Sequence, residues 1–121
     1  MYMAKKANQE LNASPITLSQ VKGEAFELLE AVIKLDCVEI KEEVADVIYF
    51  SLCHLEHRFG LNLPLVGASP TINKIKERFE KWEKIFEHHG LAFDKKYLVG
   101  GSNYKKQEKV DAALAIARKS N

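Results

Sequence analysis

The sequence predicts an all-α fold, on three observations. Apolar residues recur at intervals of three and four over four long stretches, the spacing that places them on one face of a helix. Pro15, Pro64 and Pro70 all fall outside those stretches. Nowhere do β-branched residues alternate with polar ones over the length of a strand. We therefore expect a four- to five-helix bundle that is built on an antiparallel helical hairpin and completed by oligomerisation.

Two consecutive helices are predicted to form the hairpin. Ser14 precedes a proline, and Thr17 and Gln20 have the spacing of a capping box, so the first helix starts near these residues. Gly60 is a typical residue to end the second helix. The link between the two helices is short, which brings them back antiparallel. The expected ranges are about 14–34 and 39–59, with the link at 35–38.

Two further helices are predicted after the hairpin. An irregular connection at 61–70 leads to a third helix at about 71–89, which carries one apolar stripe and ends at Gly90. Gly100 and Gly101 indicate a tight turn before the last helix. We expect residues 1–121 to form a single domain, with residues 1–13 as a flexible N-terminal segment and residues 104–121 as a C-terminal helix.

Length, composition and charge limit the class of protein. The 121 residues fit one domain, and 46% hydrophobic and 29% charged residues are ordinary globular values. A net charge of +1 predicts no overall attraction to a nucleic-acid polymer or an anionic membrane. Cys37 and Cys53 lack metal-ligand spacing, which favours reduced, intracellular thiols. No apolar run approaches the ~18 residues of a membrane span, so we expect a cytoplasmic protein.

Two pairs of carboxylates carry the chemistry of the hairpin. Glu24 and Glu27 are three residues apart on the first helix, and Glu43 and Asp46 have the same spacing on the second. Each pair therefore shares a helix face. Glu27 and Asp46 are equally far from the midpoint of the link, so we expect them at the same height. Four carboxylates in one small volume repel one another, and a hard divalent cation with oxygen ligands relieves that repulsion.

The helical wheel places Glu43 near the middle of an apolar stripe, where a buried carboxylate needs a cation, a proton or a basic partner. Glu27 points away from the apolar face of its own helix. We therefore expect the site in a groove that another helix or subunit covers. Gly23 and Ala31 lie one turn either side of Glu27 and permit a close approach. The alternative for any single pair is a solvated face with ordinary i,i+4 ion pairs.

The two acidic segments resemble the MazG-like, all-α nucleoside triphosphate pyrophosphohydrolases. Their signature is EExxE, a spacer and then ExxD, and residues 24–31 and 43–50 read EAFELLEA and EVADVIYF. Gly23 replaces the first glutamate of the signature, whereas the other four carboxylates are present. The resemblance is good over residues 18–56 and weaker over the third helix, and nothing specific is recognised beyond Gly90.

The resemblance implies hydrolysis of an NTP or dNTP to the monophosphate and pyrophosphate. Four modest helices with an exposed groove at Glu27 also favour a second copy that closes the site, so we expect a homodimer or homotetramer. The resemblance further implies Mg²⁺, with Mn²⁺ as a substitute. Glu27 is the first choice for the general base, although spacing does not decide among the carboxylates or the number of ions. The implied metal ligands are Glu24, Glu27, Glu43 and Asp46.

Several residues are candidates for contacts with the nucleotide. Lys74 and Arg78 share a helix face and can bind phosphates, or they form a solvated face. Asn73 occupies a place where the resemblance implies a contact with the base. Tyr49 or Phe50 is a candidate to stack on the base, although core packing is the alternative for Phe50.

The sequence leaves other readings open. These are a non-catalytic helical interaction module that retains the fold and a phosphoribosyl-ATP-type pyrophosphohydrolase. The preferred base and sugar, the choice between dimer and tetramer, and the role of residues 91–121 also stay open.

Overall fold

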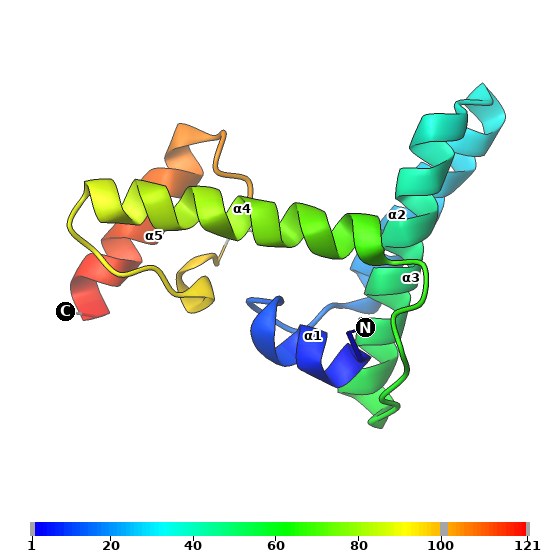
Figure 1. Ribbon diagram of the computed structural model, residues 1–121, viewed down its shortest axis with the longest axis horizontal. Helices are drawn as coiled ribbons and strands as arrows, with labels where there is room; N and C mark the ends of the chain where they lie inside the picture. The colour runs from blue at the N-terminus through cyan, green and yellow to red at the C-terminus, as the bar shows by residue number, and fades with distance from the viewer. Residues whose placement is uncertain (1, 100–101, 121) are drawn as a thin grey trace. The chain divides into compact units, whose positions relative to one another are not determined.

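The computed structural model describes residues 2–99 and 102–120, which fold into helices joined by short connections (Figure 1). Extended pairing among these residues is limited to one isolated bridge between Met3 and Pro64. The prediction of an all-α fold is confirmed, and oligomerisation stays a prediction. The elements are α1 (Ala4–Glu10), α2 (Leu18–Lys34), α3 (Cys37–Phe59), α4 (Ser69–His88), the 3-10 turn η1 (Lys95–Tyr97) and α5 (Gln107–Ser120).

The chain divides into two compact units, and α4 contributes to both. The first unit ends at Asn73 and the second begins at Lys74. The first contains the hairpin of α2 and α3, together with α1 and the start of α4. The second contains the rest of α4, η1 and α5. Each unit is described by itself, and a single domain over residues 1–121 stays a prediction.

Local capping determines the ends of the hairpin helices. Thr17 Oγ1 accepts a hydrogen bond from the backbone N–H of Gln20 at 3.2 Å, and Gln20 Oε1 accepts one from the N–H of Thr17 at 2.8 Å. This capping box is the predicted one. Asp36 caps α3 by accepting from the N–H of Glu39 at 3.1 Å, so α3 starts two residues earlier than expected. Gly60, with φ at +72°, ends α3 as predicted.

The N-terminal segment is ordered, contrary to the prediction of a flexible segment at residues 1–13. Residues 4–10 form α1, which packs against α3 and buries Ala4 and Ala7 completely. Two backbone hydrogen bonds join the segment to the connection before α4, from the N–H of Ala4 to Leu63 O at 2.8 Å and from that of Leu65 to Tyr2 O at 2.9 Å. Small buried alanines on a seven-residue helix give little periodicity, so the sequence did not indicate this helix.

The first unit buries an unexpected face of α3 and leaves much of α2 uncovered. The buried residues of α3 are Ala45, Tyr49 and Cys53, four residues apart, rather than those of the predicted apolar stripe that has Glu43 near its middle. Within α2 the buried residue is Ala31. Several large apolar side chains of the hairpin are therefore exposed to solvent in the single chain. On α2 and the link they are Leu18, Phe26, Leu29, Val32, Ile33 and Leu35, and on α3 Val38, Val44 and Phe59.

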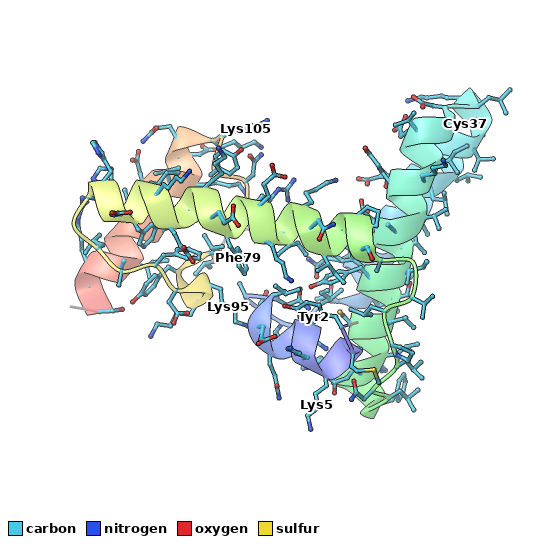
Figure 2. The ribbon with its side chains drawn as sticks, viewed as in Figure 1. Tyr2, Lys5, Cys37, Phe79, Lys95 and Lys105 are labelled. Atoms are coloured by element: carbon cyan, nitrogen blue, oxygen red, sulfur yellow. The ribbon has the colours of Figure 1, made fainter. Side chains whose placement is uncertain are left out.

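The second unit has a core of its own, made largely of aromatic rings. Trp82 and Phe86 of α4 are fully buried, and the Trp82 indole N–H donates to the carbonyl of Ser102 at 2.9 Å. Phe79 projects from α4 toward the loop that precedes η1, where its ring centroid lies 5.8 Å from that of Phe93 (Figure 2). Helix α5 covers this core with Val110, Ala113, Leu114 and Ala117.

The remaining predictions concern helix ends and membranes. Helix α4 begins at Ser69, two residues before the expected start, and Gly90 has φ at +71° just beyond its end. Helix α5 begins at Gln107, three residues after the expected start. The predicted turn at Gly100 and Gly101 lies outside the described residues. Among the described helices, none combines the length and apolar character that crossing a membrane requires.

Candidate functional site

Three carboxylates from the two helices of the hairpin meet at one point. One oxygen atom from each of Glu24, Glu27 and Glu43 lies within 4.8 Å of the others. We call these three residues the acidic triad. Glu24 and Glu27 are one turn apart on α2, and Glu43 reaches them from α3 across the antiparallel packing. The triad thus contains three of the four carboxylates that the sequence analysis singled out.

The register of the hairpin differs from the prediction and explains which carboxylates meet. The link consists of Leu35 and Asp36 alone, because α2 continues to Lys34 and α3 starts at Cys37. Leu35 closes this tight link with a left-handed backbone, at φ 55° and ψ 35°. A shorter link moves the level positions along α3 toward its start, so the position level with Glu27 shifts from Asp46 to Val44, next to Glu43.

The environment of the triad disfavours ionised carboxylates at two positions. Burial first, and then the negative charges of Glu27, Asp46 and Glu43, together raise the pKa of Glu24 to about 7. Burial likewise raises the pKa of Glu43 to about 7, again with the charges of Glu27 and Asp46 adding to the effect. Glu27 is exposed and is the member of the triad that solvent or a ligand reaches directly.

Two oxygens of the triad fit a cation. Glu24 Oε2 and Glu43 Oε2 are shielded from solvent and accept no hydrogen bond from any residue in the described part of the chain. A buried carboxylate oxygen without a donor is costly, so each needs either a proton shared with Glu27 or a positive ion. Three carboxylate oxygens at this spacing match the oxygen ligands that Mg²⁺ and Mn²⁺ prefer.

Asp46, the fourth expected ligand, lies beside the triad but outside the three-oxygen group. Its charge contributes to the raised pKa values of both Glu24 and Glu43. Its Oδ1 accepts a hydrogen bond of 2.6 Å from the hydroxyl of Thr71, at the start of α4. The sequence reasoning missed Thr71, because no spacing pattern connects positions that lie 25 residues apart in different helices.

The structure separates the two aromatic candidates for stacking on a base. Tyr49 is fully buried, and its hydroxyl donates to Asn12 Oδ1 at 2.6 Å. Its ring therefore has no free face for a base, and the prediction of stacking by Tyr49 is wrong for this structure. Phe50 is half-buried and touches Tyr49 edge to face at 5.7 Å between ring centroids. Phe50 remains the candidate of the pair.

The polar candidates on α4 belong to different units. Asn73 is exposed and is the last residue of the first unit. Lys74 and Arg78 belong to the second unit, where Lys74 is exposed and Arg78 is half-buried. Arg78 Nη1 donates to the hydroxyl of Ser102 at 3.4 Å. Contacts of Asn73, Lys74 and Arg78 with a nucleotide stay predictions.

Comparison with known proteins agrees with the acidic motif. A family model described as the MazG nucleotide pyrophosphohydrolase domain matches residues 14–82, more than half of the chain. That range includes the whole hairpin and the start of α4 with Thr71. No curated protein and no solved structure matches the chain. The family match and the acidic hairpin together show that this chain belongs to the MazG nucleotide pyrophosphohydrolase family.

Proposed function

We propose that this chain is a Mg²⁺-dependent pyrophosphohydrolase that cleaves an NTP or dNTP to the monophosphate and pyrophosphate. The family provides the reaction class. The observation that carries the proposal is the acidic triad, with its two shielded carboxylate oxygens that accept no hydrogen bond from the described residues. An unsatisfied acidic cluster opposes folding and suits a cation that arrives with a triphosphate.

The metal ligands in this proposal are Glu24, Glu27, Glu43 and Asp46, with Mg²⁺ as the ion and Mn²⁺ as a substitute. When bound, the cation offsets the negative charge of the phosphates and makes the attacked phosphorus more electrophilic. Glu27 is our choice for the general base that takes a proton from the attacking water. It is the exposed member of the triad, and the other two carboxylates are the more buried ones.

Nucleotide contacts in this proposal come from α3 and α4. The Lys74 ammonium and the Arg78 guanidinium are four residues apart on α4 and suit the β- and γ-phosphates, because both are cationic hydrogen-bond donors. Phe50 offers a partly accessible ring for the base. Asn73, which is exposed, has an amide that can both donate to and accept from a base edge.

The proposal also includes assembly of the chain into a homodimer or homotetramer. Phe26 is 67% exposed and Ile33 is 72% exposed, and the two lie two turns apart on α2. A Cβ added at Gly23 would meet nothing within 4 Å in the single chain, so this part of α2 is open to a close approach. A continuous exposed apolar face on a hairpin is typical of a surface covered by another subunit.

The decisive experiment measures which phosphate product appears. A panel of NTPs and dNTPs with Mg²⁺ is incubated with the wild-type chain, with Glu43→Gln and with Glu42→Gln, and pyrophosphate and orthophosphate are assayed separately. Glu42 is the matched control, since it is the exposed neighbour of Glu43 on α3. We expect pyrophosphate from the wild type and from Glu42→Gln, and a loss of at least about 100-fold for Glu43→Gln.

The same assay separates the alternatives. Orthophosphate as the sole product would contradict cleavage between the α- and β-phosphates. Hydrolysis of phosphoribosyl-ATP with no turnover of the NTPs and dNTPs would indicate that substrate class instead. Gly23, in place of the first glutamate of the motif, is the one observation that favours a non-catalytic interaction module. Absence of turnover for every nucleotide, with an intact fold, would establish that alternative over the enzyme.

A further inference from the structure

Thr71 has an unusual position for a hydroxyl side chain. It is 4% exposed, and among the described residues it is the one polar or charged residue that is buried as a whole. Its hydroxyl donates to Asp46 Oδ1 at 2.6 Å. This distance lies at the short end of the range for an O–H···O hydrogen bond.

The surroundings of Thr71 hold its hydroxyl in place. Ala68 and Ile72, on the same stretch of chain, are buried, and the N–H of Ile72 donates to Ala68 O at 3.0 Å. A Cβ added at Gly67 would lie 3.1 Å from Ile48 Cδ1, so the connection before α4 lies close against α3. Leu65, fully buried in the same connection, is joined by a backbone hydrogen bond to the N-terminal segment.

We infer that Thr71 is a positioning residue, which orients the Asp46 carboxylate for the metal site through its hydroxyl. The inference rests on the proposed function, because it takes Asp46 as a metal ligand. A hydrogen bond to Oδ1 fixes the rotation of the carboxylate and leaves Oδ2 to face a ligand. Outer partners that orient metal-binding side chains in this way affect metal affinity or activity by about 10- to 100-fold when removed.

A merely structural role makes different predictions. If Thr71 only filled space, Thr71→Val would leave Mn²⁺ affinity and kcat unchanged, because valine has nearly the same shape and keeps the methyl group. If instead the hydroxyl matters, Thr71→Ser retains the hydrogen bond and Thr71→Val loses it. Oδ1 of the half-buried Asp46 would then lose its donor.

The experiment measures Mn²⁺ affinity on the full chain, by electron paramagnetic resonance of the free ion, beside the kcat and KM for pyrophosphate release. We expect Thr71→Val to weaken Mn²⁺ binding by about 10- to 100-fold and to lower kcat at saturating Mg²⁺. We expect Thr71→Ser to stay within about threefold of the wild type. Thr71→Ala makes the same test if the valine variant fails to fold, as judged by circular dichroism.

A double-mutant cycle isolates the contact itself. In an Asp46→Asn background, Thr71→Val is expected to cause no additional loss of Mn²⁺ affinity, because the carboxylate that the hydroxyl orients is absent. Equal losses for serine and valine, wild-type Mn²⁺ affinity for Thr71→Val, or fully additive losses in the cycle would each overturn the inference. A wild-type chain that binds Mn²⁺ but releases no pyrophosphate would overturn the proposed reaction alone. A wild-type chain that binds no Mn²⁺ would overturn the metal site and the role of Thr71 together.

Discussion

The α2–α3 hairpin and the aromatic core of the second unit differ in the groups that they leave unsatisfied. In the hairpin, carboxylate oxygens of Glu24 and Glu43 are shielded, whereas Phe26 and Ile33 face solvent. In the second unit, Trp82 and Phe86 are 0% exposed, and the Trp82 indole has its hydrogen-bond partner. The core of the second unit thus buries its large rings and satisfies the Trp82 indole without a partner. The hairpin leaves both kinds unsatisfied, and the proposed metal ion and the proposed second subunit would satisfy them.

The physical reason is that an active site and a stable core make conflicting demands. Burying charge in a cluster costs free energy in the isolated chain, and the raised pKa values of Glu24 and Glu43 reflect that cost. Edge-to-face and stacked rings, such as Phe86 with Phe93 and with Tyr97, stabilise without any partner. Four predictions test this contrast.

The largest expected effect on stability is in the second unit. Trp82→Ala removes a fully buried indole and its hydrogen bond to Ser102, so we expect it to lower the free energy of unfolding by about 3–5 kcal/mol. Val99→Ala, at a residue that is 78% exposed, is the control and should change it by less than about 0.5 kcal/mol. Urea denaturation followed by circular dichroism measures both. Similar losses for the two variants would refute a self-contained core around Trp82.

The second prediction concerns the exposed apolar face of α2. Ile33→Glu places a charge on that face, so we expect the assembled chain to dissociate, with a dissociation constant raised at least about tenfold. Val99→Glu puts the same charge on an exposed position of the second unit and should leave the assembly unchanged. Light scattering after size-exclusion chromatography gives the mass of each species. A monomeric wild type at all concentrations would disprove the proposed oligomer.

The third prediction is a pH dependence of the hairpin. Glu24 and Glu43 have a pKa of about 7 in the folded chain, against an ordinary pKa of 4.5 for an unburied glutamate, so the folded state binds more protons between these limits. Stability of the metal-free chain is therefore greatest below about pH 4.5 as far as these groups contribute, and that contribution is lost as the pH rises through 7. We expect Tm without metal to fall between pH 5 and pH 8.

Two comparisons check that the triad causes this pH dependence. Mg²⁺ should restore Tm at pH 8, because it replaces the lost protons on the carboxylates, and should have little effect at pH 5. Glu43→Gln should raise Tm at pH 8 in the absence of metal, whereas Glu42→Gln should not, since Glu42 is exposed. Differential scanning fluorimetry across this range measures all of these. A wild-type Tm that does not change with pH would show that burial does not raise the pKa of the triad carboxylates.

The smallest expected effect separates the two neighbouring aromatic residues. Tyr49→Phe removes the hydroxyl that bonds to Asn12 and should lower the free energy of unfolding by about 1 kcal/mol without changing KM for the nucleotide. Phe50→Leu should raise KM with little change in stability, because Phe50 is half-buried. Steady-state kinetics beside urea denaturation separates the two effects. A raised KM for Tyr49→Phe would reinstate Tyr49 as a base contact.

Much of the fold was predictable from local patterns. The capping box of Thr17 and Gln20, the stop at Gly60 and the proline-containing connection all depend on residues a few positions apart. The same is true of the carboxylate pairs, because a spacing of three places both members on one helix face. What escaped prediction was α1, with its small buried alanines, and the starts of three later helices. Those of α3 and α4 differ from expectation by two residues and that of α5 by three.

The sequence by itself determined the helical elements and the two acidic pairs, since both depend on residues within a turn or two of helix. The same acidic segments identified the family. The tertiary structure decided the rest. It set the packing that brings a Glu43 oxygen within 4.8 Å of oxygens of Glu24 and Glu27, the burial that leaves two carboxylate oxygens unsatisfied, and the contact of Thr71 with Asp46. These features depend on how helices pack across a two-residue link and a connection ahead of α4. Packing at that range is decided by the burial of surfaces from many residues together, which no local spacing encodes.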